Sequence, residues 1–263
     1  MVATVLHEIP LQGGDVTDGV VRVGDTVRRP VSASTPAVHA LLRHLEAVGF
    51  AGAPRVVGSG VDGLGRQVLE YLPGSTGVRL ESVRDDVLGR LGGLLREYHD
   101  ATRGFPLRRE GWEGGSNDDR APEVVGHCDL TPGNVVFRAG VPYGMIDFDL
   151  ARPTTRLFDV VTTLRHWAPL ADPVDRHPLL RNVAVGRRVR VFCDAYGVPA
   201  RERRRLVEVA RVRFQRSYAV MRSRAAAGGN WAQMWAGGAG ERIRRAVAWL
   251  DVHEDEIHAH LVP

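Results

Sequence analysis

The sequence predicts an α+β fold with two lobes. Residues 1–72 alternate short apolar segments with turn residues, which is typical of strands, whereas the chain after Pro73 and Gly74 follows the spacing of helices. The change of pattern places the lobe boundary between Glu70 and Gly74. We therefore expect an N-terminal lobe at residues 1–72 with a small antiparallel sheet and one helix, and a mostly helical C-terminal lobe at residues 73–263.

The N-terminal lobe is predicted to consist of short strands and a single helix. The expected strands cover residues 4–9, 19–23, 26–31 and 67–72, and the expected helix covers residues 36–48. Gly13 and Gly14 lie in the turn between the first two strands, where glycine lets backbone N–H groups approach a phosphate. The same Gly-Gly-Asp sequence is also an ordinary hairpin turn, so both interpretations remain open.

The C-terminal lobe is predicted to combine helices with one hairpin. A first helix is expected from Val83 to near Gly104, because apolar residues recur on one face. The hairpin is expected from two short apolar runs that are separated by turn residues. These runs cover residues 135–137 and 143–146, and further helices are expected at residues 156–167, 179–196, 200–227 and 240–259, with no strand after Asp149.

Four polar residues flank this hairpin. His127, Asp129 and Asn134 precede it, and Asp147 follows its second strand. A hairpin returns the chain to its start, so we expect Asp147 beside Asn134. One carboxylate for an acceptor hydroxyl, with a second carboxylate and an Asn oxygen for magnesium, is the layout of a Mg·ATP phosphotransfer site. The alternative is that these residues only cap a turn and end a strand, but the joint pattern favours a functional site.

This segment resembles a known family. His-Cys-Asp-Leu-Thr-Pro-Gly-Asn followed by Ile-Asp-Phe-Asp is similar to the aminoglycoside phosphotransferase family, which has a protein-kinase-like fold and includes choline-kinase-like and other small-molecule kinases. The resemblance covers most of residues 10 to 170 and implies ATP and Mg²⁺ as cofactors. It implies that Asp129 is the catalytic base and that His127 braces the catalytic loop. Asn134 and Asp147 would be the metal ligands.

The resemblance also implies an adenine-binding hinge between the lobes. The backbone N–H and C=O groups of Glu70 and Leu72 are the expected contacts. Residues 69–72 also fit an edge strand that is ended by Pro-Gly, and the two interpretations are compatible.

The chain departs from this family because it contains no lysine, and all 35 of its Lys and Arg residues are arginine. The strand lysine that holds the α- and β-phosphates in the family therefore has no counterpart. If Val27 faces the adenine, strand alternation sends Arg29 to the same face and Arg28 outward. Arginine presents a longer, planar fork, so the exchange is not conservative. We expect Arg29 to contact the phosphates.

The acidic partner of that lysine is also absent. No acidic residue occurs between Asp25 and Glu46, and Val38 or His39 falls near the expected position. We expect His39 to be an exposed helix residue. Without an acidic partner on the helix, Arg29 is expected to be less rigidly placed when nucleotide is absent.

Length and composition indicate a globular enzyme, because the 263 residues are 44% hydrophobic and 25% charged. No apolar run approaches the roughly 18 residues that a membrane span needs, and no signal-peptide pattern opens the chain. We therefore expect a cytoplasmic protein without a membrane partner. Cys128 and Cys193 do not make a disulfide framework. The oligomeric state stays open.

The net charge of +4 is concentrated in the C-terminal part, since residues 176–224 hold fourteen arginines against three acidic residues. This density could attract nucleic acid, but aromatic residues are sparse there and no nucleic-acid motif occurs. We favour a solvated helix face.

These observations favour an O-phosphotransferase that transfers the γ-phosphate of ATP to a hydroxyl of a small molecule, either an aminoglycoside-like antibiotic or another hydroxylated metabolite. The alternative is a catalytically weak, nucleotide-binding regulatory protein, because the lysine and glutamate are missing. A protein kinase is disfavoured, since no Ala-Pro-Glu sequence follows Asp149.

A polycationic acceptor would need a pocket of carboxylates. The candidates are Asp172, Asp175, Asp251, Glu254, Asp255 and Glu256. The surrounding arginines would repel a polycation, so the sequence leaves the acceptor unidentified.

Overall fold

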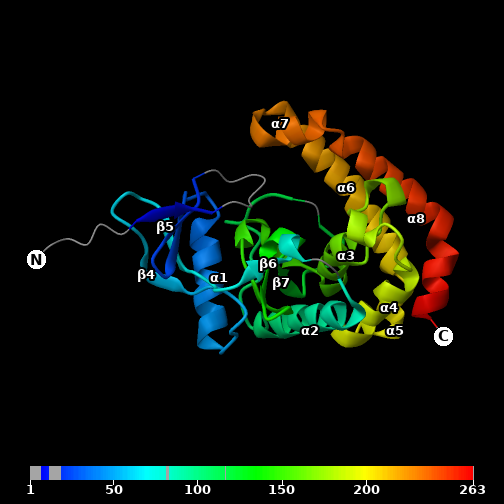
Figure 1. Ribbon diagram of the computed structural model, residues 1–263, viewed down its shortest axis with the longest axis horizontal. Coiled ribbons are helices and arrows are strands. Elements are labelled where there is room, and N and C mark those ends of the chain that lie inside the picture. The colour runs from blue at the N-terminus through cyan, green and yellow to red at the C-terminus, as the bar shows by residue number, and fades with distance from the viewer. Residues whose placement is uncertain (1–6, 12–18, 81–82, 116, 263) are drawn as a thin grey trace, which may run out of the picture.

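The N-terminal lobe is a five-stranded antiparallel sheet with one helix packed beside it (Figure 1). The computed structural model describes residues 7–11, 19–80, 83–115 and 117–262, so Gly13 and Gly14 lie outside the described residues. The strand order is β1-β2-β3-β5-β4. The elements are β1 (Glu8–Pro10), β2 (Val21–Val23), β3 (Thr26–Arg29), α1 (Thr35–Ala47), β4 (Val56–Val61) and β5 (Gln67–Glu70).

Helix α1 forms because its apolar residues share one face and Pro36 lies in its first turn, where a missing N–H is harmless. Leu41, Leu42 and Leu45 on that face are buried. Burying a side chain of this size contributes about 1.5–3 kcal/mol. Strand β4 is missing from the sequence prediction, because its Gly-Ser-Gly centre is typical of turns.

The C-terminal lobe begins with helix α2 and a set of short strands. Strands β8 and β9 form the predicted hairpin, and β10 pairs antiparallel with β7. The elements are β6 (Ser75–Thr76), α2 (Asp85–Ala101), β7 (Val124–Gly126), β8 (Val135–Arg138), β9 (Val141–Met145) and β10 (Arg152–Thr154). The prediction of no strand after Asp149 is therefore wrong, because the Arg-Pro-Thr of β10 has no alternating pattern and depends on pairing with a distant partner.

The rest of the lobe is helical, with α6 and α8 lying side by side and α7 at one end of this pair (Figure 1). The helices are α3 (Arg156–Trp167), α4 (Val185–Tyr196), α5 (Ala200–Arg203), α6 (Leu206–Ala226), α7 (Gly229–Ala236) and α8 (Ala239–Leu261). The helix expected from residue 179 begins only at Val185, and the one expected at residues 200–227 is split into α5 and α6. Helix α7 was not expected, since glycines flank it on both sides.

The core of this lobe lies where α2, α3 and α4 meet behind the hairpin. Leu91, Phe158, Trp167 and Phe192 are fully buried there. The Trp167 Nε1–H also donates to the Leu130 carbonyl at 2.8 Å, which ties the core to the segment that carries the polar motif. The predicted α+β architecture, a small sheet with one helix followed by a mostly helical part, is confirmed.

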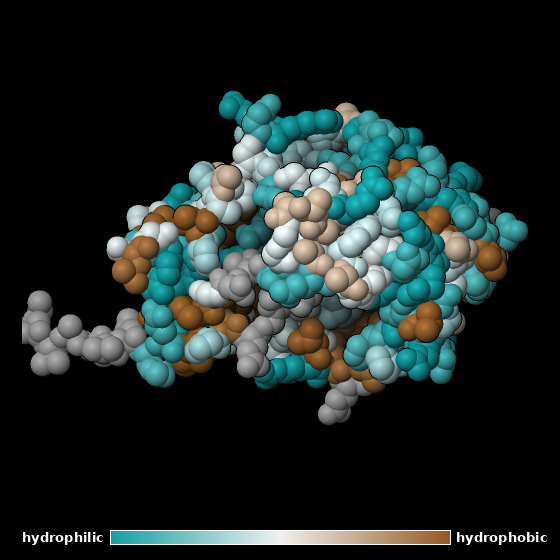
Figure 2. Space-filling model, turned by 90° about the horizontal axis from the view of Figure 1, so that it is seen from above, coloured by the Kyte–Doolittle hydropathy of each residue, from teal (hydrophilic) through white to brown (hydrophobic). Residues whose placement is uncertain are grey.

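On the surface seen in Figure 2, apolar residues gather in small separate groups among polar ones. The described residues on that face therefore present no single broad apolar patch. No helix among the described residues is long and apolar enough to cross a membrane.

Candidate active site

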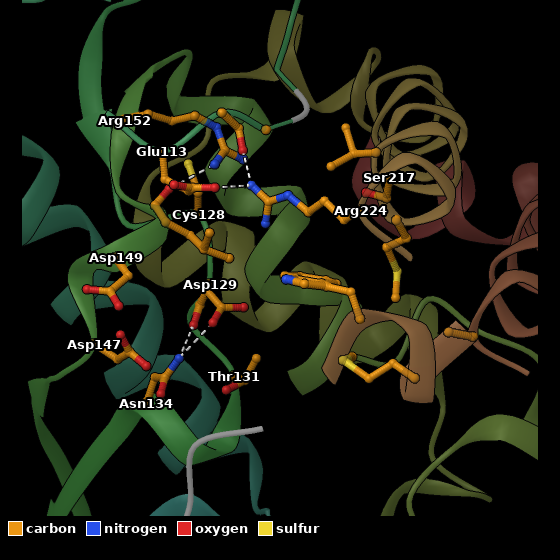
Figure 3. A pocket seen from close by; sticks show the side chains of 18 of the residues that line it. Glu113, Cys128, Asp129, Thr131, Asn134, Asp147, Asp149, Arg152, Ser217 and Arg224 are labelled. Atoms are coloured by element: carbon orange, nitrogen blue, oxygen red, sulfur yellow. Dashed lines mark hydrogen bonds and ion pairs between the residues drawn. The ribbon is translucent and has the colours of Figure 1, made fainter. Parts of the chain in front are cut away.

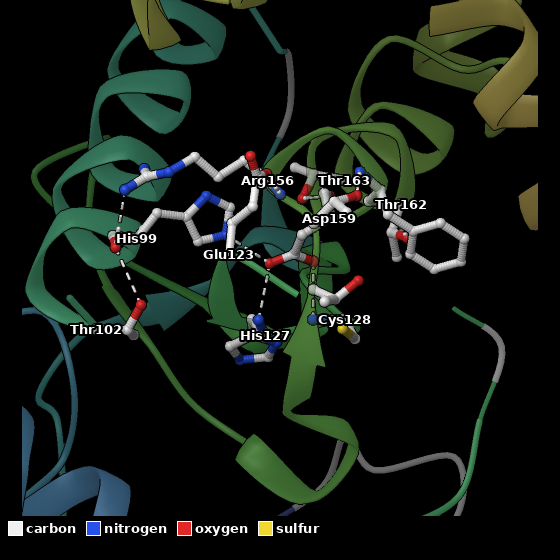
Figure 4. Close-up of polar contacts among 12 residues, drawn as sticks. His99, Thr102, Glu123, His127, Cys128, Arg156, Asp159, Thr162 and Thr163 are labelled. Carbon is white, nitrogen blue, oxygen red and sulfur yellow. Dashed lines mark hydrogen bonds and ion pairs between the residues drawn. The ribbon is translucent and has the colours of Figure 1, made fainter. Parts of the chain in front are cut away.

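A buried carboxylate holds the segment that starts at His127. Asp159, in the first turn of α3, accepts hydrogen bonds from the backbone N–H groups of His127 and Cys128, each at 2.8 Å (Figure 4). The His99 ring lies 2.9 Å from the same carboxylate through Nε2. Burial alone would raise the pKa of Asp159, but these donors hold it below its usual value. Asp159 is therefore an ionised anchor for the loop.

Two residues of the site have backbone conformations that favour glycine. Cys128 has φ of 60° and Asp147 has φ of 63°. Such conformations cost on the order of 1–3 kcal/mol each and cluster at functional sites. The hydrogen bonds that the backbone N–H groups of His127 and Cys128 donate to Asp159 hold Cys128 in this conformation. Burial raises the pKa of the Cys128 thiol to about 12, so the thiol stays protonated and unreactive.

His127 connects the loop to the end of the hairpin. Its Nε2–H donates to the Ile146 carbonyl at 3.0 Å, and its ring packs on Phe148 with the ring centroids 4.7 Å apart. Burial lowers the pKa of His127, which keeps the ring neutral. The side chain therefore lies between two segments of the site rather than in the open space before them.

Asp129, Asn134 and Asp147 lie together in space. The Asn134 Nδ2 group donates to the Asp129 carbonyl at 2.8 Å and to Asp129 Oδ2 at 2.9 Å. The Ile146 N–H donates to the Asn134 carbonyl at 2.9 Å, which brings Asp147 back beside the loop. Figure 3 shows these side chains and that of Asp149 around one space.

Asp129 has a pKa suited to proton transfer near neutral pH. Burial raises the pKa of Asp129 to about 7, and the negative charge of Asp147 adds to this shift. The positive charge of Arg213 opposes it. A general base is most effective when its pKa lies near the working pH. Burial also raises the pKa of Asp149.

Arg29 points toward the carboxylates that follow the hairpin. Its Nη1 lies 3.1 Å from Asp147 Oδ1, and its other terminal nitrogen pairs with Asp149. Arg28 is turned elsewhere and pairs with Asp62 at 3.6 Å. The expectation of a loosely placed Arg29 is therefore wrong, because the long arginine side chain is buried and reaches carboxylates from the other lobe rather than from α1.

The expectation for His39 is also wrong. Its side chain is only 6% exposed, and a Cβ atom at Gly60 would lie 2.8 Å from its ring. Burial, followed by the charge of Arg43, lowers the pKa of His39. The ring therefore packs against β4 as a neutral group, and the strand that covers it is the one that the sequence did not predict.

Glu70 and Leu72 lie at the end of β5 and beyond it. The Glu70 N–H donates to the Arg55 carbonyl at 2.8 Å, which leaves the Glu70 carbonyl as its candidate adenine contact. Within the described part of the chain, the Leu72 N–H has no hydrogen-bond acceptor. Their role in nucleotide binding stays a prediction.

A cavity of about 400 Å³ opens beside the motif. We call one wall the carboxylate side, formed by Asp129, Asn134, Asp147 and Asp149. We call the opposite wall the arginine side, formed by residues of α3, α6, α7 and α8, namely Arg165, Arg213, Met221, Arg224, Trp231, Met234 and Arg242. Arg29, Glu70 and Leu72 are not among the lining residues, whereas Arg29 contacts the carboxylate side directly.

The arginine side corrects the expectation of a solvated helix face at residues 176–224. Arg213 and Arg224 line the cavity, and Arg176 and Arg188 are buried. The one signal in the sequence was the excess of arginine over acidic residues, which does not tell which of them point inward.

The carboxylates considered for a polycationic acceptor lie elsewhere. None of the six lines the cavity. Asp175 pairs with Arg245, and Asp251 and Glu254 pair with Arg211.

The oxygen donors on the carboxylate side fit magnesium. Among the described residues, no three His, Cys, Asp or Glu side chains form a metal cluster. Magnesium does not require one, since it is usually bound by one or two carboxylates together with substrate phosphates and water. The Asn134 Nδ2 group is bonded to Asp129, which leaves Asn134 Oδ1 and the Asp147 carboxylate as the two oxygen donors.

The kinase-like class of proteins has an antiparallel sheet with one helix, a helical second lobe, and this set of side chains where the two lobes meet. The chain belongs to the phosphotransferase enzyme family, which it matches over residues 11–120 and 115–207. The resemblance drawn from the motif is thus confirmed.

One relative is similar to most of this chain. The chain is 36% identical to the trifolitoxin immunity protein of Rhizobium leguminosarum bv. trifolii over 201 residues, which cover 74% of this chain and 76% of that protein.

Solved structures show the same fold at low identity. A choline/ethanolamine kinase family protein from Mesorhizobium loti matches with a TM-score of 0.60 and 17% identity, over 97% of this chain and 92% of that one. The amicoumacin kinase hAmiN, in complex with AMP-PNP, Ca²⁺ and Ami, matches with a TM-score of 0.61 and 13% identity, over 95% and 91%. The gentamicin complex of APH(2")-IIa matches with a TM-score of 0.58 and 14% identity, over 93% and 90%. The protein-kinase-like fold is therefore confirmed.

Proposed function

We propose that this protein transfers the γ-phosphate of Mg·ATP to a hydroxyl group of a small molecule. The observation that carries the proposal is Asp129, whose pKa is raised to about 7, in one cavity with Asn134 and Asp147. Membership of the phosphotransferase family supports the reaction class.

In the proposed reaction, Asp129 accepts the proton of the acceptor hydroxyl while that oxygen forms a bond to the γ-phosphorus. The bond between the γ-phosphorus and the bridging oxygen breaks, and ADP leaves. The hydrogen bond from Asn134 fixes the orientation of the Asp129 carboxylate. His127 and Asp159 hold the backbone of the loop in its strained conformation.

Asn134 Oδ1 and Asp147 would hold Mg²⁺, which neutralises phosphate charge when it is bound. Arg29 is proposed to contact the phosphates. Because it pairs with Asp147 and Asp149 in this structure, it would have to share these carboxylates with the metal or release them. The backbones of Gly13 and Gly14 remain candidates for covering the phosphates, as those of Glu70 and Leu72 do for the adenine.

A role in resistance to an antimicrobial compound is supported by the relative that is named for trifolitoxin immunity. Two of the similar structures are a gentamicin complex and an amicoumacin kinase complex. We therefore propose an antimicrobial compound or a related hydroxylated metabolite as the acceptor.

A catalytically weak nucleotide-binding protein is the second candidate. The ion pair between Arg29 and Asp147 favours it, because an arginine that keeps this carboxylate competes with magnesium.

Two measurements separate the two candidates. The first is calorimetric titration with Mg·ATP, and the second is transfer of labelled γ-phosphate to a panel of hydroxylated antibiotics and metabolites. We expect magnesium-dependent ATP binding and transfer to at least one acceptor. ATP binding with neither phosphate transfer nor ATP hydrolysis would support the second candidate. The lack of magnesium-dependent ATP binding would contradict both candidates.

A further inference from the structure

The arginine side of the cavity gathers cations from three helices. Arg165 comes from the end of α3, Arg213 and Arg224 from α6, and Arg242 from α8. On α6 the lining residues lie 4, 7, 8 and 11 positions after Arg213, which is the spacing of one helix face, so that face is turned to the cavity. Figure 3 shows Arg224 and Ser217 of this face across the cavity from Asp129.

Neither Arg165 nor Arg213 forms an ion pair with a carboxylate of the described residues, and the acidic charge that acts on both is that of Asp129 on the other wall. The Arg213 Nε group donates to Thr162 Oγ1 at 3.0 Å, while its buried Nη1 has no hydrogen-bond partner. The Arg165 guanidinium lies over the Phe214 ring at 5.2 Å. Arg211 on the same helix pairs with two carboxylates, so acidic partners are available to α6 outside the cavity.

The two guanidinium groups also lie close enough to disfavour each other's charge. Burial, followed by the charges of Arg165 and Arg152, lowers the pKa of Arg213 to about 9. Burial and the charge of Arg242 lower the pKa of Arg165 to about 10. Both remain protonated at neutral pH, which makes this wall a concentrated positive charge that is opposed only in part by Asp129 across the cavity.

The remaining surface of the arginine side is apolar. Trp231 and Met234 of α7 and Met221 of α6 line it. Arg224 lies over the Trp231 ring at 4.8 Å and pairs with Glu113 at 2.8 Å. Outside the carboxylate side, Glu113 is the one acidic residue among the described lining residues, and Arg224 neutralises it.

We propose that the acceptor carries, besides its hydroxyl, an anionic group that pairs with Arg165 and Arg213, and an apolar or aromatic part that packs on Trp231. This proposal rests on the proposed phosphotransferase function, since only a phosphotransferase has an acceptor. An anion supplies the direct ion pair that neither cation has and gains charge-assisted hydrogen bonds from both, including one from the unpartnered Nη1 group of Arg213. A polycation would instead meet like charge across this wall. A carboxylate and a phosphate monoester both have the required chemistry.

The test is binding of matched probes that differ in charge. Calorimetry would compare 3-phenylpropionate, phenyl phosphate and 3-phenylpropylamine on the full chain, with and without Mg·AMP-PNP. We expect at least one of the two anions to bind about tenfold or more tightly than the amine, and the tighter of the two identifies the preferred anionic group. R165Q and R213Q should each weaken that anion by roughly ten- to a hundredfold, the range of a charge-assisted hydrogen bond.

R222Q is the matched control, because Arg222 is an exposed residue of α6 outside the cavity lining and its loss changes the net charge equally. It should bind like the unaltered protein. R213K keeps the charge and should retain the preference for the anion if R213Q does not fold.

Four results would overturn the proposal. They are equal or tighter binding of the amine, no binding of either anion, equal anion affinity in R213Q and R222Q, and displacement of the anion by Mg·AMP-PNP, which would place it in the nucleotide site. If Mg·AMP-PNP itself does not bind while the anion preference holds, the proposed function fails and the anion site stands.

Discussion

The carboxylate side of the cavity is built from one hairpin and its flanking loops, whereas the arginine side is assembled from separate helices. Asp129 and Asp147 are 18 positions apart in the sequence, but Arg165 and Arg242 are 77 positions apart. Local chain geometry therefore determines the first wall, and helix packing determines the second. The difference implies that phosphotransfer chemistry and acceptor choice can change independently, one in the hairpin and the other in α3, α6, α7 and α8.

The largest expected effect is a loss of stability on substitution of Asp159, which anchors the loop of the carboxylate side. Asp159→Ala leaves two backbone N–H groups and His99 without their acceptor in a buried site. It should lower the free energy of unfolding by about 3–5 kcal/mol, as measured by urea denaturation. Asp255→Ala, at an exposed position of α8, should stay within about 0.5 kcal/mol of the unaltered protein. Equal midpoints for the two variants would show that Asp159 is not the anchor.

Substitution of Arg29 tests whether its contact with the carboxylate side contributes to turnover. The adjacent Arg28 serves as the matched control. Arg29→Ala should lower turnover on the order of 10²- to 10³-fold, as the loss of one electrostatic donor in a desolvated site does. Arg28→Ala should have a small effect, because Arg28 pairs with Asp62. Steady-state kinetics of both variants would reveal the outcome, and a larger loss for Arg28→Ala would refute the assignment.

The two oxygen donors should differ in their effect on the metal requirement. Asp147→Asn removes a full negative charge beside the ion and should raise the magnesium concentration for half-maximal activity at least tenfold. Even the loss of a residue that only hydrogen-bonds to a metal ligand can have an effect of this size. Asn134→Ala should raise it less. Titration of magnesium in activity assays measures both, and an unchanged requirement in both variants would remove these residues from the metal site.

The pH dependence follows from the raised pKa of Asp129, which burial brings to about 7. Only the ionised carboxylate accepts a proton, so kcat/KM for the acceptor should fall about tenfold per pH unit below this value and level off above it. Asp147→Asn removes a neighbouring negative charge and should move the inflection to lower pH. A flat profile from about pH 5 to 8 would be inconsistent with Asp129 as the base.

The same division between the two walls explains what the sequence could predict. The hairpin and the residues around it were predictable, because their positions depend on short-range chain geometry. Asp159 was not singled out, although a carboxylate between the apolar pairs Leu157-Phe158 and Val160-Val161 is unusual. The ion pairs of Arg29 with Asp147 and Asp149 could not be foreseen, since they join residues that are more than 100 positions apart.

Other features that the sequence did not predict have the same cause. His39 is buried only because β4 covers it, and the glycines of β4 and around α7 are typical of turns when neighbouring elements are unknown. The inward-facing arginines of α6 cannot be told from its exposed ones without knowing which face packs on α3 and α8.

The central claim is that Asp129 accepts the proton of the acceptor hydroxyl, and Asp129→Ala tests it most directly when nucleotide binding and phosphate transfer are measured separately. We expect transfer to fall by roughly 10²- to 10⁴-fold, the usual contribution of a general base, while the affinity for Mg·ATP changes little. Full turnover in this variant on an acceptor that the unaltered protein phosphorylates would contradict the account.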